Sequence, residues 1–152
     1  MKLRFAGPDI AGILILAVAV PASQAQSAAD ACSLLTQAQV SAAVGAQVSE
    51  GQYVTPTFKA TCTWTTSGKI VTLMTESAGM YDTAKAHPIA GFQITPASGI
   101  GDDAYYVTIG TMVSLFTKKG NVAFKTSVYS QLPADTLKKM ESTLAQQVAS
   151  EL

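Results

Sequence analysis

The sequence predicts an α+β fold: a twisted antiparallel sheet of five to six strands with an N-terminal and a C-terminal helix packed on one face. Segments rich in β-branched and aromatic residues alternate with turn residues through residues 47–129. Segments with the apolar spacing of helices lie on either side of them, at 36–45 and after Pro133. We expect the hairpin at 61–76 to be the centre of the core.

The stretch 61–76 predicts two paired strands joined at a Ser-Gly turn. A two-residue loop there pairs Trp64 with Val71 and Cys62 with Leu73, and these four side chains then share the core face. The other face carries Thr61, Thr63, Thr65 and Thr72. A slip of one residue would move the tryptophan to the threonine face, so the alternation specifies the register.

Residues 1–25 have the organisation of a secretory signal peptide. Basic residues precede an unbroken apolar run at 10–20, and small residues follow it, with cleavage expected after Ala25 and Ala29 as the alternative. The run is shorter than the ~20 residues that span a bilayer. We therefore expect no stable membrane insertion after cleavage, and a periplasmic or secreted protein.

The cysteines agree with export. After a leader at 26–31, expected to be mobile, residues 32–152 are predicted to form a single disulfide-linked domain. Cys32 and Cys62 are the only cysteines, and an even pair in an exported chain is expected to form a disulfide. A metal site is the alternative, but the chain has one histidine and no C-x-x-C spacing. We expect no metal and no cofactor.

The charge pattern argues against nucleic acid as a partner. Lys and Arg total 10, as do Asp and Glu. The only arginine is Arg4, inside the predicted signal peptide, and the remaining chain has a net charge near −1. Phosphate binding favours arginine and concentrated positive charge, and neither is present.

Local signals place the elements of the first half. Thr36 with Gln39 three residues later forms a capping-box pattern, and Gly45 is placed to end that helix. A first strand is expected within 47–54, before the hairpin, and a short helix at 80–86.

The second half is predicted to contain most of the remaining strands. Pro88 ends the short helix, and 89–98 reads as a loop with a short edge strand. Strands are expected at 104–109, 111–117 and 121–129. The last two form a hairpin with Val113, Leu115, Val122, Phe124 and Val128 on the core face and Ser114, Phe116, Lys125 and Ser127 on the other. The final helix carries Leu137, Met140, Leu144 and Val148 at helical spacing.

Apolar residues on the face away from the core are the candidate binding residues. They are Ile70, Met74 and Phe116, with Tyr105 or Tyr106, of which one must face that way. An exposed apolar patch often marks a ligand or protein contact. The alternative is that 89–98 covers this face and forms a second small core.

A hydrolase is the alternative to a binding protein. The only histidine, His87, would act with Asp102 or Asp103. No serine lies in a G-x-S-x-G elbow, and neighbouring aspartates that enter a strand point apart. We therefore interpret the aspartates as an acidic turn that leads into a strand.

Three short motifs are Cys-Ser-Leu-Leu at 32–35, Cys-Thr-Trp at 62–64 and Gly-Ile-Gly-Asp-Asp-Ala-Tyr at 99–105. Together they resemble a group of small bacterial secreted and lipoprotein domains of unknown function, over most of 32–152. The resemblance implies a PsbP-like two-layer α+β fold with Cys32 and Cys62 paired, and no catalytic residues. The residues before Cys32 make a poor lipobox, so we expect a free protein.

The sequence thus favours an exported, non-catalytic domain that binds an unknown protein or a small apolar ligand through its sheet face or through the seam between sheet and helices. A structural accessory of the cell envelope would have the same sequence features.

Overall fold

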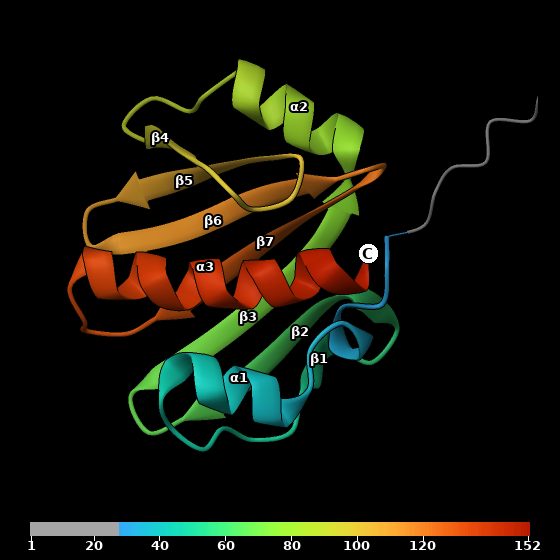
Figure 1. The fold of residues 1–152 in the computed structure, drawn as a ribbon, viewed down its shortest axis with the longest axis vertical. Coiled ribbons are helices and arrows are strands. Elements are labelled where there is room, and N and C mark those ends of the chain that lie inside the picture. The colour runs from blue at the N-terminus through green and yellow to red at the C-terminus, as the bar shows by residue number, and fades with distance from the viewer. Residues whose placement is uncertain (1–27) are drawn as a thin grey trace, which may run out of the picture.

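Seven strands form one antiparallel sheet with the order β1-β2-β3-β7-β6-β5-β4 (Figure 1). The computed structural model describes residues 28–152, so the predicted signal peptide lies outside the described residues. The strands are β1 (Gln52–Thr55), β2 (Phe58–Thr66), β3 (Lys69–Ser77), β4 (Gln93–Ala97), β5 (Asp103–Ile109), β6 (Met112–Lys119) and β7 (Val122–Tyr129). The helices are η1 (Ala31–Ser33, 3-10), α1 (Gln37–Val44), α2 (Ala78–Ala86) and α3 (Ala134–Glu151). None of these helices is long and apolar enough to cross a membrane.

The α+β class is confirmed, but the prediction of five to six strands was wrong. The seventh strand is β4, which pairs with β5 at the edge of the sheet and lies within 89–98, where a short edge strand in a loop was predicted. It contains Pro96, which has no N–H to donate and is tolerated on an edge strand. A proline in a segment of mixed polarity gives a weak strand signal, which is why the sequence suggested mainly a loop there.

The register of the β2–β3 hairpin is as predicted. Trp64 pairs with Val71 and Cys62 with Leu73, and all four side chains are buried. β3 then pairs with β7, far along the chain, so that the hairpin lies inside the sheet rather than at its edge.

The first helix has the predicted caps. The Gln39 N–H donates to Thr36 Oγ1 at 3.2 Å, and the Thr36 N–H donates to Gln39 Oε1 at 2.8 Å. These bonds satisfy backbone groups that a helix start otherwise leaves without partners. Gly45 ends the helix with φ 67°, a conformation that favours glycine.

One large buried cluster joins a sheet face to α1 and α3. The two helices lie on the same side of the sheet (Figure 1). Its members include Trp64, Leu73, Leu115, Phe124 and Val128 from the strands, Val40 and Val44 from α1, and Leu137, Leu144 and Val148 from α3. Each fully buried Leu, Val or Phe contributes roughly 1.5–3 kcal/mol to folding. We call this side of the sheet the inner face.

A second, smaller cluster contains Tyr81 of α2, Tyr105 of β5 and Ala123 of β7. Partly buried Ile94, Val107 and Phe116 pack around it. These strand residues alternate with those of the inner face, so α2 packs on the opposite side, which we call the outer face. A second small core on this face was the alternative considered from the sequence.

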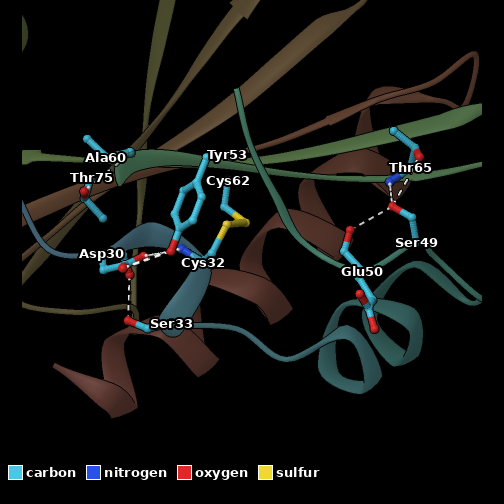
Figure 2. Close-up of a disulfide and its surroundings, with 10 residues drawn as sticks. All are labelled: Asp30, Cys32, Ser33, Ser49, Glu50, Tyr53, Ala60, Cys62, Thr65 and Thr75. Atoms are coloured by element: carbon cyan, nitrogen blue, oxygen red, sulfur yellow. Dashed lines mark hydrogen bonds between the residues drawn. A yellow bond between two sulfur atoms is a disulfide. The ribbon is translucent and has the colours of Figure 1, made fainter. Parts of the chain in front are cut away.

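The predicted disulfide between Cys32 and Cys62 is present (Figure 2). It joins η1 to β2 beside a set of hydrogen bonds from the preceding residues. Asp30 accepts from the Cys32 N–H at 3.1 Å and from the Tyr53 hydroxyl at 2.8 Å. The Thr75 hydroxyl donates to the Ala29 carbonyl at 2.6 Å. Within the predicted leader, residues 29–31 therefore contact the sheet.

Candidate functional site

The predicted binding residues fall on different parts of the sheet. Tyr105 and Phe116 pair across β5 and β6, Phe116 pairs with Lys125 on β7, and Lys125 pairs with Met74 on β3. Because paired residues share a face, these four side chains form one row across the outer face. Tyr105, Phe116 and Met74 therefore lie where they were predicted.

Tyr106 does not belong to the outer face. Its hydroxyl lies 2.5 Å from the Ser142 hydroxyl of α3, which packs on the inner face. The choice between the two adjacent tyrosines is therefore settled in favour of Tyr105, and Tyr106 connects the sheet to α3.

Ile70 also lies on the outer face, but near the start of β3, away from the row that contains Met74. It pairs with Tyr129, and its side chain is 46% exposed. Ile109 and Met112, which pair with each other, are also exposed. Ile70 is thus separated along β3 from Met74, and it does not line the pocket described next.

A small apolar pocket opens on the outer face, and we call it the α2 pocket. It encloses about 150 Å³. Its lining comes from the end of α2 and the following loop (Ala84, His87, Pro88, Ile89 and Phe92) and from the sheet (Ile94, Tyr105, Val107 and Phe116). Two of the predicted binding residues therefore meet the only histidine of the chain at one site.

Two of the four sheet residues that line the α2 pocket, Tyr105 and Phe116, are aromatic. The Tyr105 and Phe116 rings are stacked, with centroids 5.2 Å apart and planes 5° apart. The Tyr81 ring, buried under α2, lies 5.1 Å from that of Tyr105 at 49°. Each stacked or tilted pair of this kind stabilises the fold by roughly 0.5–1.5 kcal/mol beyond the contribution of its buried area. The rings make a rigid apolar surface against which a ligand group can pack.

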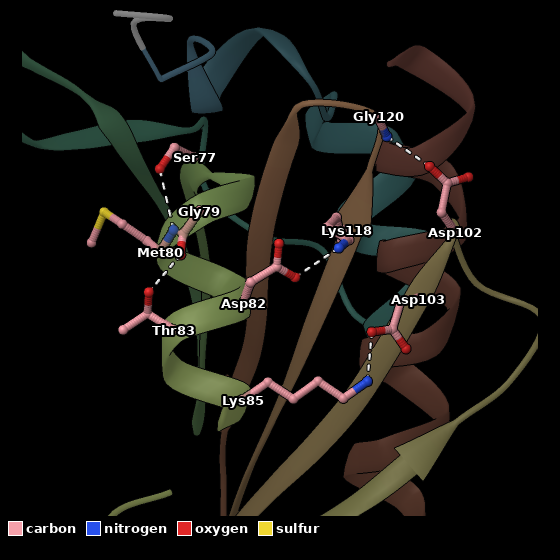
Figure 3. Close-up of polar contacts among 10 residues, drawn as sticks. All are labelled: Ser77, Gly79, Met80, Asp82, Thr83, Lys85, Asp102, Asp103, Lys118 and Gly120. Carbon is pink, nitrogen blue, oxygen red and sulfur yellow. Dashed lines mark hydrogen bonds and ion pairs between the residues drawn. The ribbon is translucent and has the colours of Figure 1, made fainter. Parts of the chain in front are cut away.

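Ion pairs hold α2 over this surface (Figure 3). Lys85 Nζ lies 2.5 Å from Asp103 Oδ2, and Lys118 Nζ lies 2.7 Å from Asp82 Oδ1. The bond from Lys85 lowers the pKa of Asp103, and the bond to Asp82 raises the pKa of Lys118. Both pairs are solvent-exposed, and such pairs contribute only about 0–1 kcal/mol each. Burial of Tyr81 is therefore the main attachment of α2.

The aspartates proposed for a hydrolase are engaged in structural contacts. Asp102 accepts from the Gly120 N–H at 2.7 Å, and this bond, followed by that from Lys119, lowers the pKa of its carboxyl. Asp103 is paired with Lys85. The His87 side chain makes no hydrogen bond or ion pair to Asp102 or Asp103. The structure thus does not bring the acid–base pair of the hydrolase alternative together.

The turn before these aspartates requires glycine. Gly101 has φ 57°, and a Cβ built on it would lie 2.5 Å from the Lys118 carbonyl oxygen. The Asp102 N–H donates to that same oxygen at 2.8 Å. The Gly-Ile-Gly-Asp motif therefore joins the start of β5 closely to β6, and it has a structural role in the fold.

Burial raises the pKa values of the tyrosines of the outer face above the usual value of about 10. Burial, followed by the carboxylates of Glu76 and Asp103, raises the pKa of Tyr105 to about 12. Burial and then Asp103 raise the pKa of Tyr81 further. Both phenols are thus uncharged near pH 7.

Within residues 28–152, no group of three or more His, Cys, Asp or Glu side chains is placed to hold a metal ion.

The sequence pattern predicted the rings on the sheet side of the pocket but not the side that comes from the loop. Ile89, Phe92 and Ile94 lie at the pocket, in the segment that was interpreted as a possible cover for this face. Apolar residues in a segment of mixed polarity were the available signal. The combination of a helix end and an edge strand at one site depends on tertiary packing.

Comparison with protein-family models, with functionally curated proteins and with solved structures finds no match to this chain. The resemblance to small secreted domains therefore stays a prediction, and the α2 pocket is the feature of the molecule that points to a function.

Proposed function

We propose that this protein is an exported, non-catalytic binding module whose ligand places one apolar group in the α2 pocket. The observation that carries the proposal is the pocket itself, whose lining is mostly apolar and includes the stacked rings of Tyr105 and Phe116. Concave, mostly apolar sites with few polar groups are typical of ligand-binding pockets.

The size of the pocket limits the group that it accepts. Apolar cavities of about 150 Å³ bind molecules the size of benzene, and the α2 pocket encloses about this volume. Pockets that enclose a drug-sized molecule have volumes of roughly 300–1,000 Å³. The α2 pocket therefore accepts one ring or one branched aliphatic side chain, and the rest of the ligand lies outside it.

The expected affinity for such a group alone is low. Full burial of a Leu or Phe side chain is worth about 1.5–3 kcal/mol, and a dissociation constant of 1 mM corresponds to about 4 kcal/mol. A ligand with useful affinity must therefore make further contacts beside the pocket.

The compartment is part of the proposal. A disulfide between Cys32 and Cys62 is consistent with an oxidising location outside the cytoplasm. Together with the signal-peptide pattern at 1–25, this supports a periplasmic or secreted protein.

Benzene binding to matched variants tests the proposed function. Ala84 lies at the pocket on an exposed position of α2, so Ala84→Phe introduces a ring that competes for the pocket without truncating a core residue. Ala86 is exposed on the same helix and does not line the pocket, so Ala86→Phe is the control. Saturation-transfer NMR should detect benzene on the wild-type protein and on Ala86→Phe, with a strong loss on Ala84→Phe. Equal signals from the two variants, or none from the wild type, would reject the pocket as the site.

A further inference from the structure

A lysine without a carboxylate partner lies beside the α2 pocket. Lys125 Nζ is 5.8 Å from the centroid of the Phe116 ring, which lines the pocket. The ammonium group has no carboxylate oxygen within 4.0 Å among residues 28–152, and its residue is only partly buried. Lys125 is not among the residues that line the pocket, but its positive charge lies next to one of the rings that do.

Lys85 is near the same aromatic pair but is differently placed. Its Nζ is 5.9 Å from the Tyr105 centroid, and it is bound to Asp103 at 2.5 Å. Because its charge is already compensated, Lys85 offers little to an anion. Of the two ammonium groups beside the stacked rings, Lys125 is the available one.

Glu76 is the acidic group that acts on Lys125 across the sheet. Burial raises the pKa of Glu76, and the charge of Lys125 opposes this effect. The two residues lie on neighbouring strands, since Glu76 pairs with Ala123, two positions before Lys125. Their side chains form no ion pair within 4.0 Å. Glu76 therefore compensates the lysine only from a distance.

We propose that the ligand of the α2 pocket is an apolar monocarboxylate, whose apolar group occupies the pocket and whose carboxylate binds the Lys125 ammonium. The inference rests on the proposed function and adds the chemical class of the ligand. A free apolar acid and the C-terminal residue of a peptide both supply an apolar group next to a carboxylate. Charge-assisted hydrogen bonds are about twice as strong as neutral ones, so a carboxylate should bind more tightly than the matching amide.

The test compares acids with their amides on the full domain. 3-Phenylpropionate and 3-phenylpropionamide represent the free ligand, and N-acetyl-Gly-Phe with its C-terminal amide represents a peptide end. In whichever of the two pairs represents the true ligand, the acid should bind about tenfold more tightly than the amide. A tenfold ratio corresponds to ~1.4 kcal/mol, which a hydrogen bond to a charged group can supply. Dissociation constants from NMR titration give the ratios.

Variants assign the preference to the lysine. Lys125→Gln should reduce the acid-to-amide ratio to near one without weakening amide binding, and Lys125→Arg should restore it. Glu76→Gln should raise the affinity for the acid. Lys139→Gln, a change on α3, is the matched control and should alter nothing. Thermal unfolding of each variant checks that the fold is kept.

The outcomes separate the two proposals. If neither acid nor amide binds, the proposed function itself fails. If both bind with equal affinity, or if Lys125→Gln keeps the acid preference, the apolar site stands and the carboxylate assignment is overturned.

Discussion

The ring of Tyr105 lies parallel to that of Phe116, with centroids 5.2 Å apart, on the sheet face opposite α3. Tyr105 is almost fully buried, whereas Phe116 is partly exposed where it borders the α2 pocket. The pair thus links the small second core under α2 to a surface that a ligand can reach. The two rings therefore contribute both to packing and to the proposed binding surface.

Truncation of Phe116 should cost stability, and truncation of Ile70 should not. Phe116→Ser removes one ring of the stack from a half-buried position, with an expected loss of about 2 kcal/mol, below the 3–5 kcal/mol of fully buried aromatic residues. Ile70 is 46% exposed, so Ile70→Ser should change the free energy of unfolding by less than about 1 kcal/mol. Urea unfolding measures both. Similar losses for the two variants would mean that Ile70 also belongs to a packed core.

Removal of the disulfide should destabilise the domain by ~3–4 kcal/mol. Cys32 and Cys62 are 30 positions apart in the sequence, and the loop-entropy relation gives about this value for a loop of that length. The double variant Cys32→Ala/Cys62→Ala, compared with the wild type in urea with and without reductant, supplies the measurement. Reductant should affect the wild type and leave the variant unchanged. A loss well below 1 kcal/mol would show that hydrogen bonds at η1 alone hold the N-terminal segment.

Stability should fall as the pH rises from about 4.5 to about 8, because of one buried acid. Glu141 of α3 has no exposed surface, and its Oε1 accepts from the Val128 N–H at 3.0 Å. Burial raises the pKa of its carboxyl from 4.5 to about 8, against the effects of that bond and of Lys138. The folded protein keeps the proton over this range, whereas the unfolded chain loses it. Ionisation therefore favours unfolding, by a total on the order of 4 kcal/mol.

The variant Glu141→Gln isolates this contribution. It keeps the acceptor oxygen for Val128 and cannot ionise, so its free energy of unfolding should lack most of the decline between pH 4.5 and 8 that the wild type has. The raised pKa of Glu76 accounts for the smaller decline that remains. Parallel pH profiles for the two proteins would show that Glu141 is not the cause.

Gly101→Ala should be more damaging than Gly110→Ala. Both glycines have nearly the same positive φ, 57° and 58°, so backbone strain of about 1–2 kcal/mol applies to each. At Gly101 a Cβ also lies 2.5 Å from the Lys118 carbonyl oxygen, whereas at Gly110 it meets nothing within 4 Å. The difference in unfolding free energy between the two variants measures the close contact of the turn with β6. Equal losses of unfolding free energy for the two variants would mean that the turn can shift away from the new Cβ without loss of stability.

Local rules predicted the parts of the fold that depend on neighbouring residues. The Thr36 capping box, the Gly45 helix end and the pairing of Trp64 with Val71 follow from spacing within short stretches, and the structure has all three. The Cys32–Cys62 disulfide, which the structure has, was predicted from the cysteine count together with the expected export.

Features that depend on distant packing were not predicted. Adjacent strand residues point to opposite faces, so the sequence could not say which of Tyr105 and Tyr106 faces outward without a fixed reference for β5. Gly51 gave no signal of its own, yet a Cβ there would lie 2.8 Å from Trp64 Nε1 and 2.9 Å from Cys62 Sγ. Its small size is required only because the chain passes over the buried hairpin.

The pocket was the least predictable feature. It needs the end of α2, the loop through Phe92 and the edge strand β4 to meet over Tyr105 and Phe116. None of these segments identifies the others by spacing or by pattern. Only the apolar character of the rings on the wrong face of the sheet indicated a site.

A methyl shift map of the protein with benzene shows directly whether the α2 pocket is the binding site. Binding there should shift only the methyl groups of Ile89, Ile94 and Val107, which line the α2 pocket, and leave those of Ile70 and Ile109 unchanged. Shifts centred on Ile70 and Ile109 instead, or no saturable shifts at any methyl group, would contradict it.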